Sequence, residues 1–223
     1  MQAVAENLWV MCFPLRLLGT ALGRIVTLLR LRSGEIVIHS TAPFSSEDVA
    51  AILALGRPSA LVEATLVHDA FARQGRAAFV SVPYFAPEDF SRATSLSTHS
   101  YSALPPSWEN ELEVLLLEGM PKIREHVFFH RPSRTLVVAD LVFNFGPDTP
   151  RWTRLFFNGA GGIRHYPGMS RIFRAMIRDR AAFSQSIETM LKWDFDRVIV
   201  GHGAIIETDG KSRVRKALAS QGF

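Results

Sequence analysis

One apolar run near the middle of the chain, interrupted by a carboxylate, constrains the fold more than any other feature. The run extends from Leu136 to Phe143, and Asp140 is its one ionisable residue. Its hydrophobicity predicts a buried strand. Burying an ionised carboxylate costs on the order of several kcal/mol unless a cation, a hydrogen-bond network or a metal compensates its charge. We therefore expect Asp140 to meet such a group.

A second unusual element is the histidine that follows the last apolar strand. Residues 197–200 read as a strand, and Gly201, His202 and Gly203 follow it directly. The two glycines leave the imidazole of His202 with little steric cover. A carboxylate and a histidine at strand ends are the donors of a metal or acid–base site. The alternatives are a salt-bridged or hydrogen-bonded structural aspartate and a turn histidine whose glycines only shape the loop.

Composition limits the class of protein. The 223 residues are 48% hydrophobic and 21% charged, which is typical of a globular domain with a sizeable core. The net charge of +4 is too small to indicate a nucleic-acid partner, and no basic stripe alternates with aromatic residues. The single cysteine, Cys12, excludes an internal disulfide and a cysteine-based zinc site.

The N-terminal region is apolar enough to require a test for membrane insertion. Proline and arginine residues interrupt it between Leu8 and Leu31, so no window reaches the roughly 18 uncharged residues of a membrane span. A small-residue cleavage site is absent, which argues against a signal peptide. We expect a cytoplasmic protein with no membrane partner.

The remaining pattern mixes strands and helices. A hairpin is predicted over 25–32 and 35–40, and a helix capped by Ser45 and Asp48 ends at Gly56. Further strands are predicted at 60–67, 77–82, 111–117, 126–130, 134–143 and 197–200. Further helices are predicted after residue 69, at 170–177, at 178–193 and from residue 211. Residues 94–107 and 147–167 are predicted to be irregular. This order favours a single α/β domain in which sheets pack together with helices outside.

With these motifs in place, the chain resembles the metallo-β-lactamase-like superfamily, and is most similar to a poorly characterised bacterial branch of it. The resemblance covers most of the chain and rests on four segments: the hairpin turn 32–35, Val67-His68-Asp69-Ala70-Phe71, residues 129–140, and Val200-Gly201-His202-Gly203. They resemble the superfamily's opening hairpin, its histidine-rich metal motif, the strands that lead to its bridging aspartate, and the loop of its last histidine. The resemblance implies one domain, residues 1–223, folded as a four-layer αββα sandwich of mixed sheets, with the site at the sheet edges.

The metal motif departs from the superfamily pattern. His-x-His-x-Asp-His is replaced by the segment from Glu63 to Asp69, in which His68 is the one histidine. Met120 lies where the superfamily pattern has a loop that supplies another histidine ligand, and a methionine does not suit a hard catalytic metal. The donors that remain suffice for one zinc, iron or manganese ion and are too few for a confident pair. They are His68, Asp69, Asp140 and His202, with His126 in reserve.

Several of these residues have simpler interpretations. Asp69 can be the N-cap of the helix that follows it. His126 and His130 lie four apart on a predicted strand and so share a face, where cross-strand polar contacts are the alternative to a site. The turn formed by Arg131, Ser133 and Arg134 can bind an anion or can carry ordinary solvated arginines.

The resemblance implies a metal-dependent hydrolase that cleaves an ester-like or phosphoester bond of a small molecule. Asp140 and His202 would then lie at its catalytic centre, and a metal would supply the activated water. The competing hypothesis is a catalytically inactive pseudoenzyme that keeps the fold and binds a small ligand or partner in the old cleft. The loss of the histidine cluster favours the second hypothesis, and the presence of Asp140 and His202 favours the first.

Overall fold

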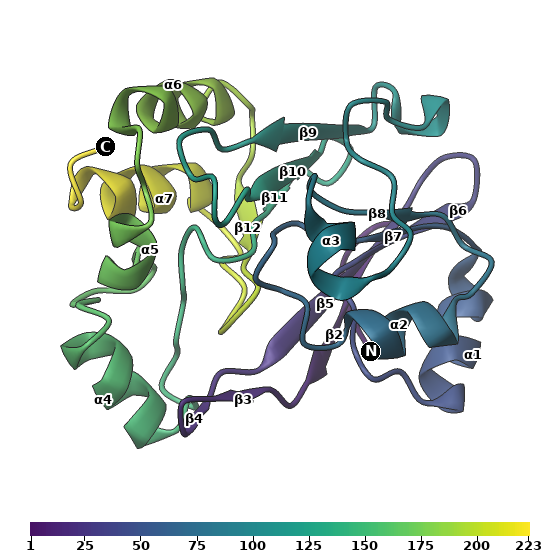
Figure 1. Cartoon of the computed structure of the whole chain (residues 1–223), viewed down its shortest axis with the longest axis horizontal. Helices are drawn as coiled ribbons and strands as arrows, with labels where there is room; N and C mark the ends of the chain where they lie inside the picture. Colours follow the sequence, from purple (N-terminus) through teal and green to yellow (C-terminus); the bar gives the residue numbers. More distant parts are fainter.

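Two β-sheets lie face to face at the centre of the molecule, as a computed structural model of residues 1–223 shows (Figure 1). The larger sheet has the strand order β1 (Gln2–Ala5), β2 (Leu8–Phe13), β5 (Arg24–Arg30), β6 (Glu35–His39), β7 (Arg57–Val62) and β8 (Tyr84–Phe85). The smaller has the order β12 (Arg197–Ile199), β11 (Thr135–Val137), β10 (His126–His130) and β9 (Leu112–Leu116). A separate hairpin pairs β3 (Arg16–Leu17) with β4 (Thr20–Ala21).

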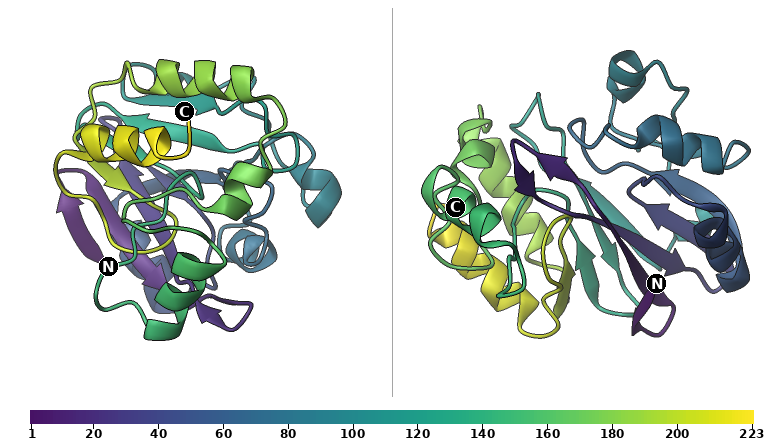
Figure 2. Two further views of the ribbon diagram at one scale, coloured as in Figure 1. Left: turned by 90° about the vertical axis from the view of Figure 1, so that its left-hand side faces the viewer. Right: turned by 90° about the horizontal axis from the view of Figure 1, so that it is seen from below.

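Helices form the two outer layers, which are seen edge-on in the right panel of Figure 2. The larger sheet is covered by α1 (Ser46–Leu55), α2 (Ala72–Ala78) and α3 (Phe90–Thr94). The smaller is covered by α5 (Arg171–Ala175), α6 (Arg180–Met190) and α7 (Gly210–Ala219), while α4 (Arg151–Gly159) packs beside β4 and η1 (Pro106–Trp108) is a short 3₁₀ turn. None of these helices combines the length and the hydrophobicity that crossing a bilayer requires.

Each sheet buries both of its faces, because successive side chains of a strand point to opposite sides. In β10, Phe128 packs in the core between the sheets, whereas Val127 and Phe129 pack under α5, α6 and α7. In the larger sheet, Ala60 faces the same inter-sheet core and Leu61 faces α1, α2 and α3. The expected four-layer αββα sandwich is therefore confirmed.

Many predicted elements are present. The hairpin is β5 with β6, and the predicted strands at 111–117, 126–130 and 197–200 are β9, β10 and β12. At the start of α1, Ser45 Oγ accepts a hydrogen bond from Asp48 N at 3.1 Å, and Asp48 Oδ2 accepts one from Ser45 N at 2.9 Å. This reciprocal arrangement is the capping box that the sequence predicts.

Other boundaries were wrong. The strand predicted at 77–82 does not form, because α2 continues to Ala78, and the region 147–167 contains α4. Residues 2–13, for which the sequence reading gave no strand, form β1 and β2. Two predicted strands end early: the one placed at 60–67 is β7 at 57–62, and the one placed at 134–143 is β11 at 135–137. Both truncations convert strand into loop where the candidate site residues lie.

Sheet topology gathers several segments at one edge of the sandwich. Strands β11 and β12 are parallel, so the loops that follow them emerge together. Strand β7 is parallel to β6, while β5 is antiparallel to β6, so the start of β5 lies beside the ends of β6 and β7. The two sheets are joined here, because Ile25 N donates to Gly201 O at 3.1 Å. This edge carries the candidate site.

Candidate metal centre

Three side chains from three distant loops meet at this edge. His68 follows β7, Asp140 follows β11 and His202 follows β12, and their ligand atoms all lie within 4.8 Å of one another. The distance from His68 Nε2 to Asp140 Oδ2 is 3.2 Å, and that from His202 Nε2 to Asp140 Oδ1 is 3.4 Å. The polar groups that face the Asp140 carboxylate are therefore two imidazoles.

The loop that carries Asp140 is shaped by a second buried acid. Glu125 is fully buried, and its carboxylate accepts hydrogen bonds from the backbone N–H groups of Ala139, Asp140 and Leu141 at 2.9, 3.1 and 3.2 Å. These groups would otherwise extend the ladder of β11, so Glu125 ends the strand and turns Asp140 toward the histidines. Burial and the nearby Asp140 charge raise the pKa of Glu125 to about 8.

His202 is held by its neighbours in a defined tautomer. Its Nδ1 lies within hydrogen-bonding distance of the Gly23 carbonyl, which can only accept, so Nδ1 carries a proton. The ring also stacks on Phe143, with 5.8 Å between centroids. Both flanking glycines are required sterically, since a Cβ on Gly201 would lie 2.6 Å from Ala139 O and one on Gly203 would lie 2.4 Å from Asn144 O.

His68 has a different partner. Its Nδ1 contacts a guanidinium nitrogen of Arg24, a residue of β5 that is only 1% exposed. Because a guanidinium can only donate, Nδ1 accepts and carries no proton in this contact. Burial and the Arg24 charge lower the pKa of His68 to about 4, despite the opposing effect of Asp140. His68 is therefore neutral near pH 7.

Protonation of the three residues bears directly on metal binding. With Nδ1 turned to the Gly23 carbonyl, His202 directs Nε2 at Asp140 Oδ1, and a metal ion bound between these two atoms would take the place of a proton. The buried Nε2 of His68 likewise faces Asp140, 3.2 Å from Oδ2, without the geometry of a full hydrogen bond. The donor set thus fits one metal ion in position and chemistry. The Arg24 contact is the one feature that opposes it, since a histidine ligand normally donates through its other nitrogen.

Asp140 is the anion of the group. Burial alone would raise its pKa, but the facing imidazoles of His68 and His202 outweigh burial and hold the pKa of Asp140 well below its usual value. Its side chain keeps 15% exposure, compared with 3% for His68 and 2% for His202. The carboxylate is thus ionised and is the member of the group that solvent or a ligand can reach.

An apolar cavity of about 410 Å³ opens onto the three residues. Of its 20 lining residues 13 are hydrophobic, which suits a ligand with an aliphatic or aromatic part. The hydrophobic wall includes Leu17 and Leu18 of the β3–β4 hairpin, Phe156 and Phe157 of α4, and Ile172 of α5. Phe156 and Phe157 therefore cover this cleft, whereas Trp152 is exposed and is absent from its lining.

Two other donors that the sequence suggested do not join the group. Asp69 is exposed and lines the cavity, but its carboxylate lies outside the cluster, and the N-cap of α2 is Phe71. His126 directs Nδ1 at Arg124 O, 3.0 Å away, and His130 pairs with Ser133 Oγ at 2.7 Å. These histidines thus make polar contacts close by in the chain, instead of the cross-strand contacts that were the expected alternative to a site.

The arginines of the turn before β11 are surface residues and do not form an anion site. Arg131 pairs with Glu113 at 2.6 Å and Arg134 with Asp194 at 2.9 Å, so both guanidinium groups already have carboxylate partners. A free anion has no unpaired arginine to bind in this turn.

Three buried charged residues near the site were missed by the sequence reading. In the sequence, Arg24 is one of the arginines that interrupt the apolar N-terminal stretch, and no motif includes Glu125. Glu63 accepts hydrogen bonds from Thr41, and burial raises its pKa to about 7. Glu63 had the same signal as Asp140, an acid between Val62 and Ala64 at the end of an apolar run. Nothing local to Glu125 distinguishes it from a surface acid.

Comparison with known proteins finds similar structures but no similar sequences. No family model and no curated protein sequence matches the chain. Its structure is similar to a metallo-β-lactamase from Pontibacter korlensis, with a TM-score of 0.66 and 13% identity over 99% of this chain and 97% of that one. The DIM-1 metallo-β-lactamase gives 0.63 and 17% over 98% and 95%, and a metallo-β-lactamase from Hirschia baltica gives 0.65 and 11% over the same shares.

At sequence identities this low, the structural similarity establishes the architecture but indicates no substrate. The strand order, the layers and the site at the sheet edge are those that the resemblance implied. The chain therefore has the metallo-β-lactamase fold, with a buried His–Asp–His group in place of a full set of metal ligands.

Proposed function

We propose that the protein is a metal-dependent hydrolase that holds one divalent ion through His68, Asp140 and His202 and cleaves an ester-like bond. The observation that carries the proposal is the convergence of three donor atoms within 4.8 Å at the wall of an apolar cavity. Three protein ligands and an open position are the minimum for a catalytic zinc site. The hydrophobic lining of this cavity favours a substrate with an apolar acyl or alkyl group.

The residues around the site have separable tasks. A bound ion would polarise the scissile group and activate water. The Gly23 carbonyl fixes the tautomer that leaves His202 Nε2 free to bind, and Glu125 fixes the backbone that presents Asp140. One Asp140 oxygen can serve as a ligand while the other accepts a hydrogen bond from the attacking water. The aliphatic and aromatic walls exclude bulk water from the bond that is cleaved.

Metal content and esterase activity of purified variants test the proposal. The wild-type protein is expected to keep about one zinc, iron or manganese ion per chain after dialysis and to cleave nitrophenyl esters. Asp140→Asn and His202→Ala are expected to lose both the ion and the activity. Asp69→Asn is the matched control, because Asp69 lines the same cavity outside the donor group. A metal-free wild-type protein whose melting temperature does not rise with added metal would overturn the proposal.

A second candidate function is favoured by the Arg24 contact. If Arg24 keeps its hydrogen bond to His68 Nδ1, the proton of the neutral ring lies on Nε2, which faces Asp140. The carboxylate and the guanidinium then balance in charge without an ion. In this alternative the protein is a pseudoenzyme that binds an apolar small molecule in the cavity.

The variant Arg24→Gln separates the two functions. It removes a buried positive charge and frees His68 Nδ1 for a proton, so it should strengthen metal binding. Metal uptake by the wild-type protein supports the hydrolase. Uptake by Arg24→Gln together with none by the wild-type protein supports the pseudoenzyme. Failure of both proteins to bind metal contradicts the idea that Arg24 is what opposes the ion.

A further inference from the structure

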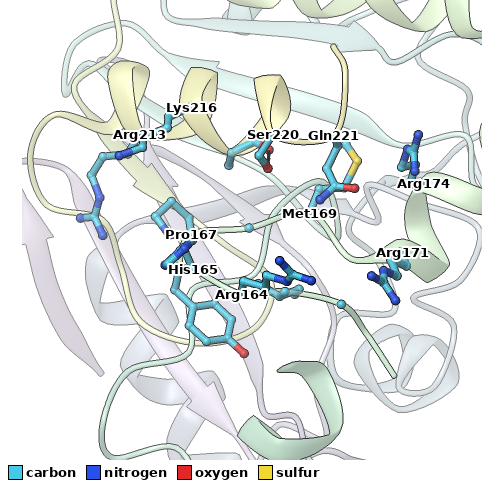
Figure 3. Close-up of a pocket in the computed structure, with 15 residues that line it drawn as sticks. Arg164, His165, Pro167, Met169, Arg171, Arg174, Arg213, Lys216, Ser220 and Gln221 are labelled. Atoms are coloured by element: carbon cyan, nitrogen blue, oxygen red, sulfur yellow. Dashed lines mark hydrogen bonds between the residues drawn. The ribbon is translucent and has the colours of Figure 1, made fainter. Parts of the chain in front are cut away.

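A second cavity, separate from the candidate metal centre, is lined by positive charge. It has a volume of about 640 Å³ and lies between α7, α5 and the segment that precedes α5 (Figure 3). Its lining includes five permanent cations and no aspartate or glutamate: Arg164, Arg171, Arg174, Arg213 and Lys216. It shares no residue with the apolar cavity beside Asp140. For a chain whose net charge is only +4, this is a strong local concentration of charge.

The five cations have no partner within the chain, and they are the unpaired cations that line this one cavity. Six other arginines each form an ion pair with a carboxylate: Arg57, Arg92, Arg124, Arg131, Arg134 and Arg197. None of the side chains of the five lining cations makes an ion pair or a hydrogen bond within the chain. Like charges around one cavity repel one another, so an anion that entered it would remove this repulsion as well as gain hydrogen bonds.

The fold holds these side chains around one space. Arg213, Lys216 and Ser220 are spaced by three and four residues, which places them on one face of α7 and its end. Arg171 and Arg174 lie three apart on α5 and approach from the other side, as Figure 3 shows. The Arg171 side chain packs over Gly162, where an added Cβ would lie 2.4 Å from its Cδ. That glycine therefore creates the place that Arg171 occupies.

The backbone beside the cavity leaves recognition to the side chains. The glycine-rich segment 159–162 has the composition of a phosphate-binding loop, yet its amides are already used. The N–H groups of Gly161, Gly162 and Ile163 donate to carbonyls of Phe156, Gly159 and Phe157. An anion in this cavity would thus be held by guanidinium groups, which form paired hydrogen bonds to phosphate oxygens.

From these observations we propose that the cavity binds a small molecule carrying two or more linked phosphate groups. Five cations exceed the need of a single carboxylate or orthophosphate, and the volume lies within the range of small-ligand sites. The ring of Tyr166 in the lining packs against Phe145, so cations, rather than a tyrosine ring, dominate the surface that a ligand would meet. The linked phosphates, and not a base, are what the site recognises.

Calorimetric titration with inorganic tripolyphosphate, pyrophosphate and orthophosphate tests this proposal on the intact protein. Affinity should rise with the number of linked phosphates and fall as salt is added. Arg171→Gln and Arg213→Gln should each weaken tripolyphosphate binding by about tenfold, the loss of roughly one charge-assisted hydrogen bond. Arg215→Gln is the matched control, since Arg215 is exposed on the same helix, has the same charge and does not line the cavity.

The outcomes are distinct. Equal weakening by Arg215→Gln and Arg213→Gln would show that net charge alone attracts the anion and would overturn the proposal, as would equal affinity for orthophosphate and tripolyphosphate. A parallel arm adds phosphatidylcholine vesicles with and without phosphatidylinositol bisphosphate. Binding to the phosphorylated vesicles that tripolyphosphate abolishes identifies a lipid headgroup as the source of the phosphates, and binding to tripolyphosphate alone identifies a free metabolite. Metal content is not involved, so this test is independent of the proposed hydrolase.

Discussion

At the scale of single residues, buried ionisable groups are more informative than exposed ones. The argument that singled out Asp140, an acid within an apolar run, is sound because such a charge needs a partner, and the partners are His68 and His202. The same argument applied to Glu63 would have found another buried carboxylate. It could not have found Glu125 or Arg24, whose importance comes from contacts made only after the sheets have packed.

Buried histidines should make the protein sensitive to acid, and His130 is the clearest case. It is fully buried and away from the candidate metal centre, and burial lowers its pKa from 6.5 to about 4. Between these values the unfolded chain binds a proton that the folded chain does not. Stability is therefore lost as the pH falls below 6.5, and the loss is complete below about 4.

Urea unfolding at about pH 7 and about pH 4.5 measures this contribution. The wild-type protein should lose about 2 kcal/mol more than His130→Gln over this interval. His165→Gln, which removes an exposed histidine, should behave like the wild-type protein. An unchanged pH dependence in His130→Gln would show that this ring does not contribute to the acid sensitivity.

At the scale of elements, the sequence predicted those whose signals are local. The capping box of α1, the turn of the β5–β6 hairpin and the apolar periods of β9, β10 and α6 all depend on residues within a few positions of one another. The end of β11 depends instead on Glu125, whose carboxylate captures backbone N–H groups 14–16 positions away in sequence. The pattern of apolar residues along the sequence does not reveal such a contact. The predicted strand therefore extended six residues too far, to 143 instead of 137.

The end of α2 and the whole of α4 were missed for a related reason. α2 presents Gly75 so closely to Thr41 that an added Cβ would lie 2.5 Å from the threonine Cβ. That packing favours a helix through Ala78, although the local run of alanine, phenylalanine and valine suits a strand. The glycines beside α4 suggested irregular structure, whereas most of them follow the helix and end it.

The loop after β12 gives the sharpest test at this scale. Gly203 has a φ of +111°, and a Cβ there would lie 2.4 Å from the Asn144 carbonyl oxygen. Gly203→Ala should destabilise the protein by at least about 2 kcal/mol and weaken metal binding, because the loop that carries His202 must shift.

Gly34→Ala is the control for backbone strain without collision. Gly34 has a φ of +79° but meets no atom within 4 Å, so its substitution should cost about 1 kcal/mol. It should leave metal affinity unchanged. A Gly203→Ala variant as stable as Gly34→Ala would mean that the loop adapts without cost.

For the whole molecule, the resemblance predicted more than periodicity did. The mixed order of elements indicated packed sheets with outer helices, but the count and order of strands come from long-range pairing that a single sequence does not display. The convergence of three loops on one edge is likewise a property of the two-sheet architecture. This is why His68, Asp140 and His202 could be grouped in advance while their anchors at Gly23, Arg24 and Glu125 could not.

The core between the sheets is what keeps the three loops together, and Phe128 lies near its centre. This ring is fully buried and packs against His39 of the larger sheet, 4.8 Å between ring centroids. Phe128→Ala should lower the free energy of unfolding by about 3–5 kcal/mol through the cavity it leaves. Phe156→Ala, at the half-buried wall of the apolar cavity, should cost much less, as chemical denaturation can establish. Comparable losses would place the main stabilising core elsewhere.

Strand β5 and the residue before it hold both imidazoles in place. Gly23 offers its carbonyl to His202 and Arg24, the next residue, contacts His68, although the two histidines belong to loops from different sheets. Because neighbouring strand residues point in opposite directions, a slip of β5 by a single position against β2 and β6 would remove both anchors together. A register slip of one residue in this strand is thus enough to disable the centre while every ionisable side chain in it remains unaltered.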